Sequence, residues 1–191
     1  TISVIYNGFS GSRYSLTMNE DSDFNGDGQK GNSLLYIPTE AEMDNMNFVD
    51  YKDKKTGKLI MSAADSRKAF TEWVNNDDYA KNHRGQYAVR NSNLSNWEHE
   101  IDLHLAQTIY NAQGLGKLEF TFDIINFANM LNKKWGASYS SAYNLSPLTV
   151  VNLNTDDDGN VTPGYAFNNA KINKSDISSR WHAQVGIRLT F

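Results

Sequence analysis

One acidic segment has residue types and spacing typical of a calcium-binding loop. Asp21, Asp23, Asn25 and Asp27 alternate with other residues, and glycine follows both Asn25 and Asp27. Alternate carboxylate and amide oxygens on a tight loop can converge on one hard cation, and glycine permits the turn. The twelfth position of either loop frame lacks the bidentate glutamate of a complete site. The segment therefore predicts either a Ca²⁺ site or a solvated turn.

The other chemistry-bearing residues form no recognisable catalytic set. The four histidines are not spaced as metal ligands, and we find no Ser–His–Asp arrangement, phosphate loop or nucleotide motif. Glu100 and Asp102 would share one face of a strand and could act as acid and base. A polar strand face that lines water explains them more simply. We therefore predict no enzymatic activity and no required cofactor, with Ca²⁺ as the one candidate ion.

The composition excludes several classes of protein. The 191 residues contain no cysteine, which excludes disulfides, thiolate metal sites and cysteine nucleophiles. The formal net charge of −4 and the lack of a basic stripe argue against nucleic-acid binding. No apolar run approaches the ~18 residues of a membrane-spanning helix. The mean hydropathy of −0.59 is typical of soluble proteins, but transmembrane β-barrels share such values because their strands are only half apolar.

The C-terminal segment gives the clearest structural signal, an unbroken alternation of apolar and polar residues. One face holds Trp181, Ala183, Val185, Ile187, Leu189 and Phe191, and the other holds His182, Gln184, Gly186, Arg188 and Thr190. A period of two predicts a β-strand with two unlike faces. Its length matches the ~9 to 11 residues of a tilted membrane strand.

Similar alternation upstream predicts an antiparallel hairpin. Ile101–Leu105 and Leu118–Ile124 alternate, and the turn-forming residues 111–116 join them. Asp102, His104 and Asp123 fall on the polar face of this hairpin.

Weaker patterns predict the remaining elements. A first strand covers Ile2–Asn7 and could continue to Leu16, and an aromatic-rich strand interrupted by Pro147 lies within Ala137–Asn152. One helix is expected near Ala64–Asn75, where apolar residues recur at helical spacing.

The connections between these elements differ in length. Asn19–Asn32 and Asn152–Ser179 are long and polar, whereas Ala128–Gly136 is shorter. Short turns on one side and long loops on the other are typical of membrane β-barrels. Aromatic residues near the predicted strand ends, at Trp97, Phe127, Trp135, Trp181 and Phe191, are typical of the aromatic girdles of such barrels.

Several stretches, in order along nearly the whole chain, resemble the C-terminal part of TonB-dependent receptors of the Oar-like and SusC-like kind. They are Asp23–Gly28 with Asn32–Pro38, His83–Ala88, Arg90–Asn91, Trp97 leading into Ile101–Gln107, and Asp123–Asn126 with Asn129–Gly136. The terminal segment also resembles the signal that the barrel-assembly machinery reads, with Trp181, Val185, Ile187, Leu189 and Phe191 as its residues. Asn96 stands where the family usually has proline.

The resemblance implies an outer-membrane location in a Gram-negative bacterium and a role in nutrient import. It implies that residues 1–191 are the C-terminal portion of a transmembrane antiparallel β-barrel, namely its last five or six strands of about 22, plus long extracellular loops and one short helix. The plug domain and earlier strands would lie outside this chain. The implied partners are the rest of the receptor chain, TonB through the plug, the assembly machinery, membrane lipid and a surface lipoprotein.

The same resemblance implies an orientation with Phe191 on the periplasmic side. Ala128–Gly136 would then be a periplasmic turn, Glu98–Ile109 would run outward, and Asn152–Ser179 would be an external loop. Five polar residues could line the cavity of the barrel: Asp102, His104, Asp123, His182 and Arg188.

Two other functions remain open from the residues. One is a passive porin or adhesin-type barrel, which would lack an upstream plug and TonB box. The other is a soluble β-sandwich that binds glycan with the help of Ca²⁺, which would be well folded without detergent.

Overall fold

The structure, a computed structural model, describes residues 1–19, 23, 26–112, 116–139, 143–155 and 157–191. Strands account for 45% and helices for 16% of the chain, which confirms the predicted all-β class. The chain forms two compact units. Residues 1–12, 95–141 and 172–191 form the first, which we call the sheet unit, and residues 13–94 and 142–171 form the second, the inserted unit. No sheet closes on itself within the described residues.

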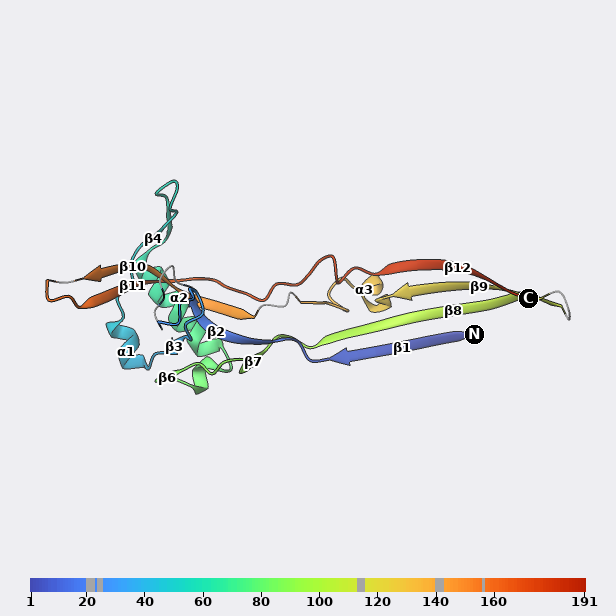
Figure 1. Cartoon of the computed structure of the whole chain (residues 1–191), viewed down its shortest axis with the longest axis horizontal. Helices are drawn as coiled ribbons and strands as arrows, with labels where there is room; N and C mark the ends of the chain where they lie inside the picture. The colour runs from blue at the N-terminus through green and yellow to red at the C-terminus, as the bar shows by residue number, and fades with distance from the viewer. Residues whose placement is uncertain (20–22, 24–25, 113–115, 140–142, 156) are drawn as a thin grey trace. The chain divides into compact units, whose positions relative to one another are not determined.

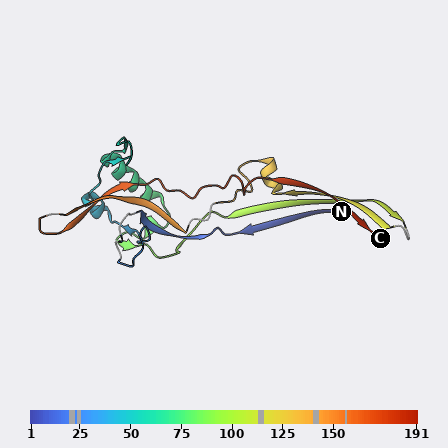
Figure 2. The same ribbon diagram turned by 45° about the horizontal axis from the view of Figure 1, so that its top comes forward.

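The sheet unit is built on one antiparallel sheet in the order β1–β8–β9–β12 (Figure 1). The strands are β1 (Ile2–Phe9), β8 (Glu98–Ala112), β9 (Gly116–Ile125) and β12 (His182–Thr190). Each strand pairs antiparallel with its neighbour, and the order of strands in the sheet is the same as their order along the chain. Figure 2 shows the four strands side by side in a second view.

The two ends of this sheet carry different connections. Lys117 pairs with Thr190 at one end, which we call the C-terminal end, and the predicted β8–β9 hairpin turns there. At the other end Phe9 pairs with Glu98 and Ile125 pairs with His182. Because the short helix α3 (Phe127–Leu131) follows β9 there, we call this the α3 end. The long connections between strands therefore all start from the α3 end.

The inserted unit has its own sheet, in the order β11–β10–β2–β7. Its strands are β2 (Arg13–Asn19), β7 (Asn93–Leu94), β10 (Asn144–Thr155) and β11 (Val161–Phe167). β2 and β10 are parallel, and the other neighbours are antiparallel. Two smaller sheets pair β3 (Tyr36–Ile37) with β6 (Gln86–Tyr87) and β4 (Tyr51–Lys52) with β5 (Leu59–Met61).

The described residues of the inserted unit form three helices, of which the first two begin at side-chain caps. The three are α1 (Glu40–Asn45), α2 (Ala63–Asn76) and the 3₁₀-helix η1 (Ala80–Asn82). Ser62 Oγ accepts the amide N–H of Asp65 at 3.1 Å, which starts α2 where the sequence predicts a helix. No helix of the described residues is long and apolar enough to cross a membrane.

The inserted unit has a continuous hydrophobic core. The fully buried side chains Leu16, Leu35, Ile37, Phe70, Val74 and Leu148 come from β2, β3, α2, β10 and the chain between them. Phe70 and Val74 lie one turn apart on α2, so the helix buries the face that its apolar spacing predicts. Phe48 adds ring contacts to Phe70 and Tyr165, at centroid distances of 6.1 and 6.5 Å.

The structure corrects the predicted strand within Ala137–Asn152 and the predicted loop Asn152–Ser179. β10 instead runs from Asn144 to Thr155, and β11 pairs with it, so this part of the expected external loop is a β-hairpin. The β10–β2 register shifts between Leu145 and Leu148, on either side of Pro147. A proline fits there because it has no N–H to donate to the ladder.

Other expectations about the elements are also corrected. The strand expected to continue from Ile2 to Leu16 is two strands, β1 and β2, in different sheets. The described residues contain three α-helices and a 3₁₀-helix rather than one short helix. The long antiparallel sheet has four strands rather than five or six, because β10 and β11 fold into the inserted unit.

The predicted orientation of Ala128–Gly136 is also wrong. This segment follows β9 at the α3 end, whereas Phe191 is at the C-terminal end, so the two cannot lie on the same side of a membrane. β8 runs toward the C-terminal end and so cannot run outward if Phe191 is periplasmic. The prediction assumed that another strand of the same sheet lies between β9 and β12. Because β9 pairs directly with β12, the segment after β9 lies at the opposite end of the sheet from Phe191.

Candidate functional site

The five polar residues singled out from the sequence share one face of the four-stranded sheet. His104 pairs with Asp123, Ile125 pairs with His182, and Glu119 pairs with Arg188. Directly paired residues point to the same face, and every second residue of a strand returns to it. The register therefore places Asp102, His104, Asp123, His182 and Arg188 on one side, which we call the polar face. Whether that face borders a barrel lumen stays a prediction.

Ion pairs and hydrogen bonds connect the polar face across strands. The His104 ring Nδ1 contacts the Asp123 carboxylate. The Glu119 carboxylate lies 2.7 Å from Lys117 Nζ and 3.5 Å from Arg188 Nη1. The His104–Asp123 and Glu119–Arg188 pairs join neighbouring strands and support their register, whereas Lys117 and Glu119 pair within β9.

The opposite face, which we call the apolar face, carries apolar side chains along all four strands. Its residues include Val4, Leu103, Leu105, Phe120, Phe122, Val185, Ile187 and Leu189. Val185 is 71% exposed and Ile187 is 67% exposed. Exposed apolar patches of this kind mark surfaces that contact lipid or another protein.

Aromatic residues gather on the sheet unit at the α3 end. Tyr6 and His99 stack at 6.1 Å and share a hydrogen bond of 2.8 Å, and Trp97 stacks on His99 at 6.2 Å. A cavity of about 410 Å³ lies between Trp97, Trp135 and neighbouring residues. The structure thus brings together Trp97 and Trp135, two of the aromatic residues that the sequence places near strand ends.

A buried asparagine holds the chain together at this end. Asn126 has φ +55°, and its backbone N–H donates to the Asp102 carboxylate at 2.9 Å. Its amide nitrogen donates to the carbonyl oxygens of Gly136 and Ser179 at 2.8 and 2.9 Å. A Cβ at Gly136 would lie 1.8 Å from the Asn126 amide oxygen, so this approach requires glycine.

The residues of the predicted assembly signal lie on β12 or flank it. Val185, Ile187 and Leu189 are on the apolar face, Trp181 precedes the strand, and Phe191 follows it with its side chain fully exposed. β12 pairs only with β9 within the described residues, so its other edge is open.

The acidic segment is described only in part. Asp21 and Asn25 lie outside the described residues. Asp23 accepts backbone N–H groups of Gly26 and Gly28 at 2.8 and 2.7 Å, and Asp27 accepts that of Gln29 at 2.8 Å. Such contacts are typical of Asx turns. No group of three or more metal-ligating side chains gathers in the described part of the chain.

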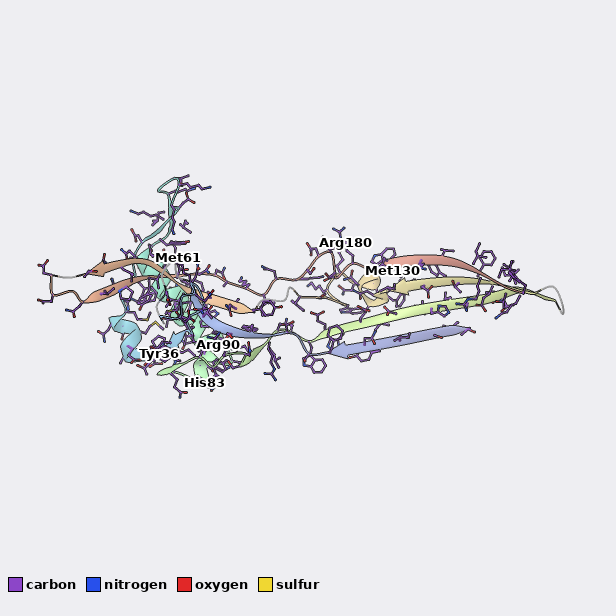
Figure 3. All side chains as sticks on the ribbon, in the orientation of Figure 1. Tyr36, Met61, His83, Arg90, Met130 and Arg180 are labelled. Carbon is purple, nitrogen blue, oxygen red and sulfur yellow. The ribbon has the colours of Figure 1, made fainter. Side chains whose placement is uncertain are left out.

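A surface groove in the inserted unit was missed by sequence reasoning. Its cavity of about 630 Å³ is lined by Met18, Ser33, Leu34, Tyr36, Tyr87, Arg90, Pro163 and Tyr165. Tyr36 and Tyr87 meet edge to face at 5.1 Å, and Tyr87 is 67% exposed. The Arg90 guanidinium makes no hydrogen bond or ion pair with any described residue (Figure 3 labels Tyr36 and Arg90).

Two tyrosines of this groove, Tyr36 and Tyr165, have a raised pKa and are protonated at neutral pH. Hydrogen bonding to the Glu42 carboxylate, at 2.9 and 3.1 Å, raises the pKa of Tyr36. Burial raises the pKa of Tyr165. Aromatic faces beside one unpaired guanidinium suit a ligand that has a flat apolar surface and an anionic or hydrogen-bond-accepting group.

In comparisons with known proteins, no family model matches the chain, and no curated protein or solved structure matches it significantly.

Proposed function

We propose that this chain is the C-terminal portion of an outer-membrane TonB-dependent receptor that imports a nutrient. The observation that carries the proposal is the four-stranded meander with one apolar, exposed face and one polar, ion-paired face. Membrane barrels require this division, because one face of every strand meets lipid and the other meets water or protein.

The open edges of the sheet support the same conclusion. β1 and β12 each pair with only one strand in the described part of the chain. Unpaired backbone groups are too costly in lipid, so both edges must pair with further strands in a closed barrel. β9 spans Gly116–Ile125, which matches the ~9 to 11 residues of a tilted membrane strand.

The proposed orientation follows from Phe191, which the resemblance places in the periplasm. The β8–β9 hairpin then turns in the periplasm, and the chain leaves the α3 end into the external space. Both segments of the inserted unit, 13–94 and 142–171, would form the external ligand-facing part. The groove of Tyr36, Tyr87, Tyr165 and Arg90 is our candidate for ligand contact.

In this mechanism the ligand binds to the external part of the receptor, and the rest of the receptor chain carries it across the outer membrane. The plug domain and earlier strands would come from the rest of the receptor chain, and TonB would pass energy through the plug. The barrel-assembly machinery would read the strand that ends at Phe191. A surface lipoprotein is a further proposed partner, and Ca²⁺ bound by the acidic segment remains part of the proposal.

Single-cysteine labelling tests the membrane assignment, and the chain itself has no cysteine to interfere. We expect cysteines at Val185 and Ile187 to react with lipid-soluble maleimides in outer membranes, and cysteines at Gln184 and Arg188 to react only with water-soluble ones. The reverse pattern, or a protein that is soluble without detergent, would contradict the proposal and favour a soluble β-sandwich. Uptake that persists in cells without TonB would favour a passive porin.

A further inference from the structure

A cavity ringed by cations lies in the sheet unit between α3 and the start of β12. Its volume is about 560 Å³, and it is lined by Asn129, Met130, Lys133, Lys174, Asp176, Ser179, Arg180 and Trp181. Three of these side chains are cationic and one is acidic. Figure 3 labels Met130 and Arg180, two of these lining residues.

Buried polar side chains hold the walls of this cavity in place. Asn129 donates to the carbonyl oxygens of Lys133 and Trp135 at 3.3 and 2.8 Å, which fixes the chain after α3. Ser179 Oγ accepts the backbone N–H of Ser138 at 2.9 Å and donates to the Ser175 carbonyl oxygen. Lys174 Nζ donates to the Lys133 carbonyl oxygen and joins the two walls. The cations are therefore presented by a defined backbone.

The two remaining cations have no partner in the described residues. The Arg180 guanidinium and the Lys133 ammonium make no ion pair or side-chain hydrogen bond there, and Asp176 pairs with neither. Three cationic side chains outnumber the one acidic side chain in this lining, which favours an anion, and phosphate accepts several charge-assisted hydrogen bonds at once.

The residues beside this cavity limit the chemical class of ligand that would fit it. Trp181 directly precedes β12, whose Ala183 and Val185 are on the apolar face, and Met130 adds a second apolar side chain to the lining. A ligand that occupied this cavity would meet both cationic and apolar side chains. An anionic amphiphile carries both kinds of group, and a fully hydrated ion does not.

We propose that Lys133, Lys174 and Arg180 bind the phosphate group of a membrane lipid whose acyl chains lie along the apolar face. This inference rests on the proposed function, because only a membrane-spanning sheet sets the α3 end at the lipid headgroup level. Basic residues at that level attract anionic headgroups, and tryptophan is typical of the same depth.

The test uses the complete protein that contains this chain, in nanodiscs of phosphatidylcholine with or without phosphatidic acid. The double variant Lys133→Gln/Arg180→Gln removes the two unpartnered cations, and Lys134→Gln/Lys171→Gln is a matched control of two exposed lysines outside the cavity. We expect the first to weaken binding of phosphatidic acid about tenfold and the control to bind as the wild type does. Arg180→Lys, which keeps the charge, should retain most of the binding.

The outcomes separate this inference from the proposed function. Unchanged binding of phosphatidic acid by the double variant would overturn the inference and leave the membrane assignment intact. Inorganic phosphate that competes as well as the lipid would show a free-anion site and would also overturn it. Failure of the labelling pattern at Val185 and Gln184 would overturn the proposed function by a measurement that involves no lipid phosphate.

Discussion

One arginine stabilises the end of helix α1. The Arg67 guanidinium donates to the carbonyl oxygens of Met43, Asp44 and Met46, at 3.0 Å for Asp44 and 2.7 Å for Met46, and lies 5.1 Å from the centre of the Phe48 ring. The last carbonyl groups of a helix have no partner within it, so an external donor satisfies them. A planar group with several N–H donors suits this task better than an ammonium.

We predict that Arg67→Ala destabilises the inserted unit by about 2 kcal/mol, because it removes the charged hydrogen-bond donor to the part-buried carbonyl oxygens of Met43 and Met46. Hydrogen exchange of the α1 amides in the complete protein measures the loss. Arg67→Lys should recover only part of it. Lys68→Ala, a change at the exposed neighbouring residue, is the control, and an equal effect there would contradict the assignment to Arg67.

The capping box of α1 predicts a pH dependence. The Thr39 backbone N–H donates to the Glu42 carboxylate at 2.9 Å, and this bond, with those from Tyr36 and the Thr39 hydroxyl, holds the pKa of Glu42 below its usual 4.5. A lowered pKa stabilises the folded state above 4.5, and the contribution disappears as the pH falls below it. We expect α1 protection factors to fall over that acidic range. Glu42→Gln should remove the pH dependence, and Glu40→Gln should keep it.

At the scale of elements, we predict that charged substitutions on the two faces of β12 have different effects on stability. Val185→Lys should destabilise the protein in lipid vesicles by about 2 to 4 kcal/mol, as a charge on the lipid face near the middle of a strand does. Gln184→Lys, one residue away on the polar face, should cost far less. Urea titration of the complete protein in vesicles measures both. Equal losses would argue that neither face meets lipid.

The spacing of apolar residues along the chain predicts β8, β9 and β12 by alternation and α2 by helical periodicity, because each of these elements has one face unlike the other. The hairpin between β10 and β11 lacks that signal, since β10 is buried in its first half and exposed in its second. The parallel pairing of Leu16 with Leu145 joins residues far apart along the chain, and no local pattern encodes it. Because β10 pairs with β2 in the inserted unit, β9 pairs with β12 instead, and the predicted orientation was wrong.

The candidate sites also differ in whether they could be predicted from the sequence. The five residues of the polar face could be found from the sequence, because strand alternation alone assigns them to one side. The groove of Tyr36, Tyr87, Tyr165 and Arg90 could not, because its members come from β3, β6, β11 and the chain after β6. Only tertiary packing brings these segments together, and each tyrosine alone is an ordinary residue.

At the scale of the whole molecule, a backbone hydrogen bond within the sheet unit spans each of the two inserted segments. The Ser95 N–H donates to the Ser12 carbonyl oxygen at 3.0 Å, across the segment 13–94. A Cβ at Gly11 would lie 1.9 Å from Ser95 Oγ, which shows how closely these strands approach. Likewise the Ser175 N–H donates to the Ser138 carbonyl oxygen at 2.8 Å, across the segment 142–171.

We predict that short glycine–serine linkers can replace segments 13–94 and 142–171 without loss of the four-stranded sheet. The reason is that Ser12 and Ser95, and likewise Ser138 and Ser175, are already hydrogen-bonded neighbours within the sheet unit, so little loop-closure entropy is added. The truncated protein should reach the outer membrane and keep the labelling pattern of β12, but lose ligand uptake. Failure of the sheet to assemble would show that the segments are needed for folding.

The hydrogen bonds between Ser12 and Ser95 and between Ser138 and Ser175 also bear on how such a protein could evolve. Recombination that exchanged one or both inserted segments for another sequence would leave the flanking strands and their register as they are. Selectivity and anchorage could then evolve at separate rates within a single gene. Grafting a foreign epitope or enzyme between Ser12 and Ser95 is the engineering counterpart of that exchange.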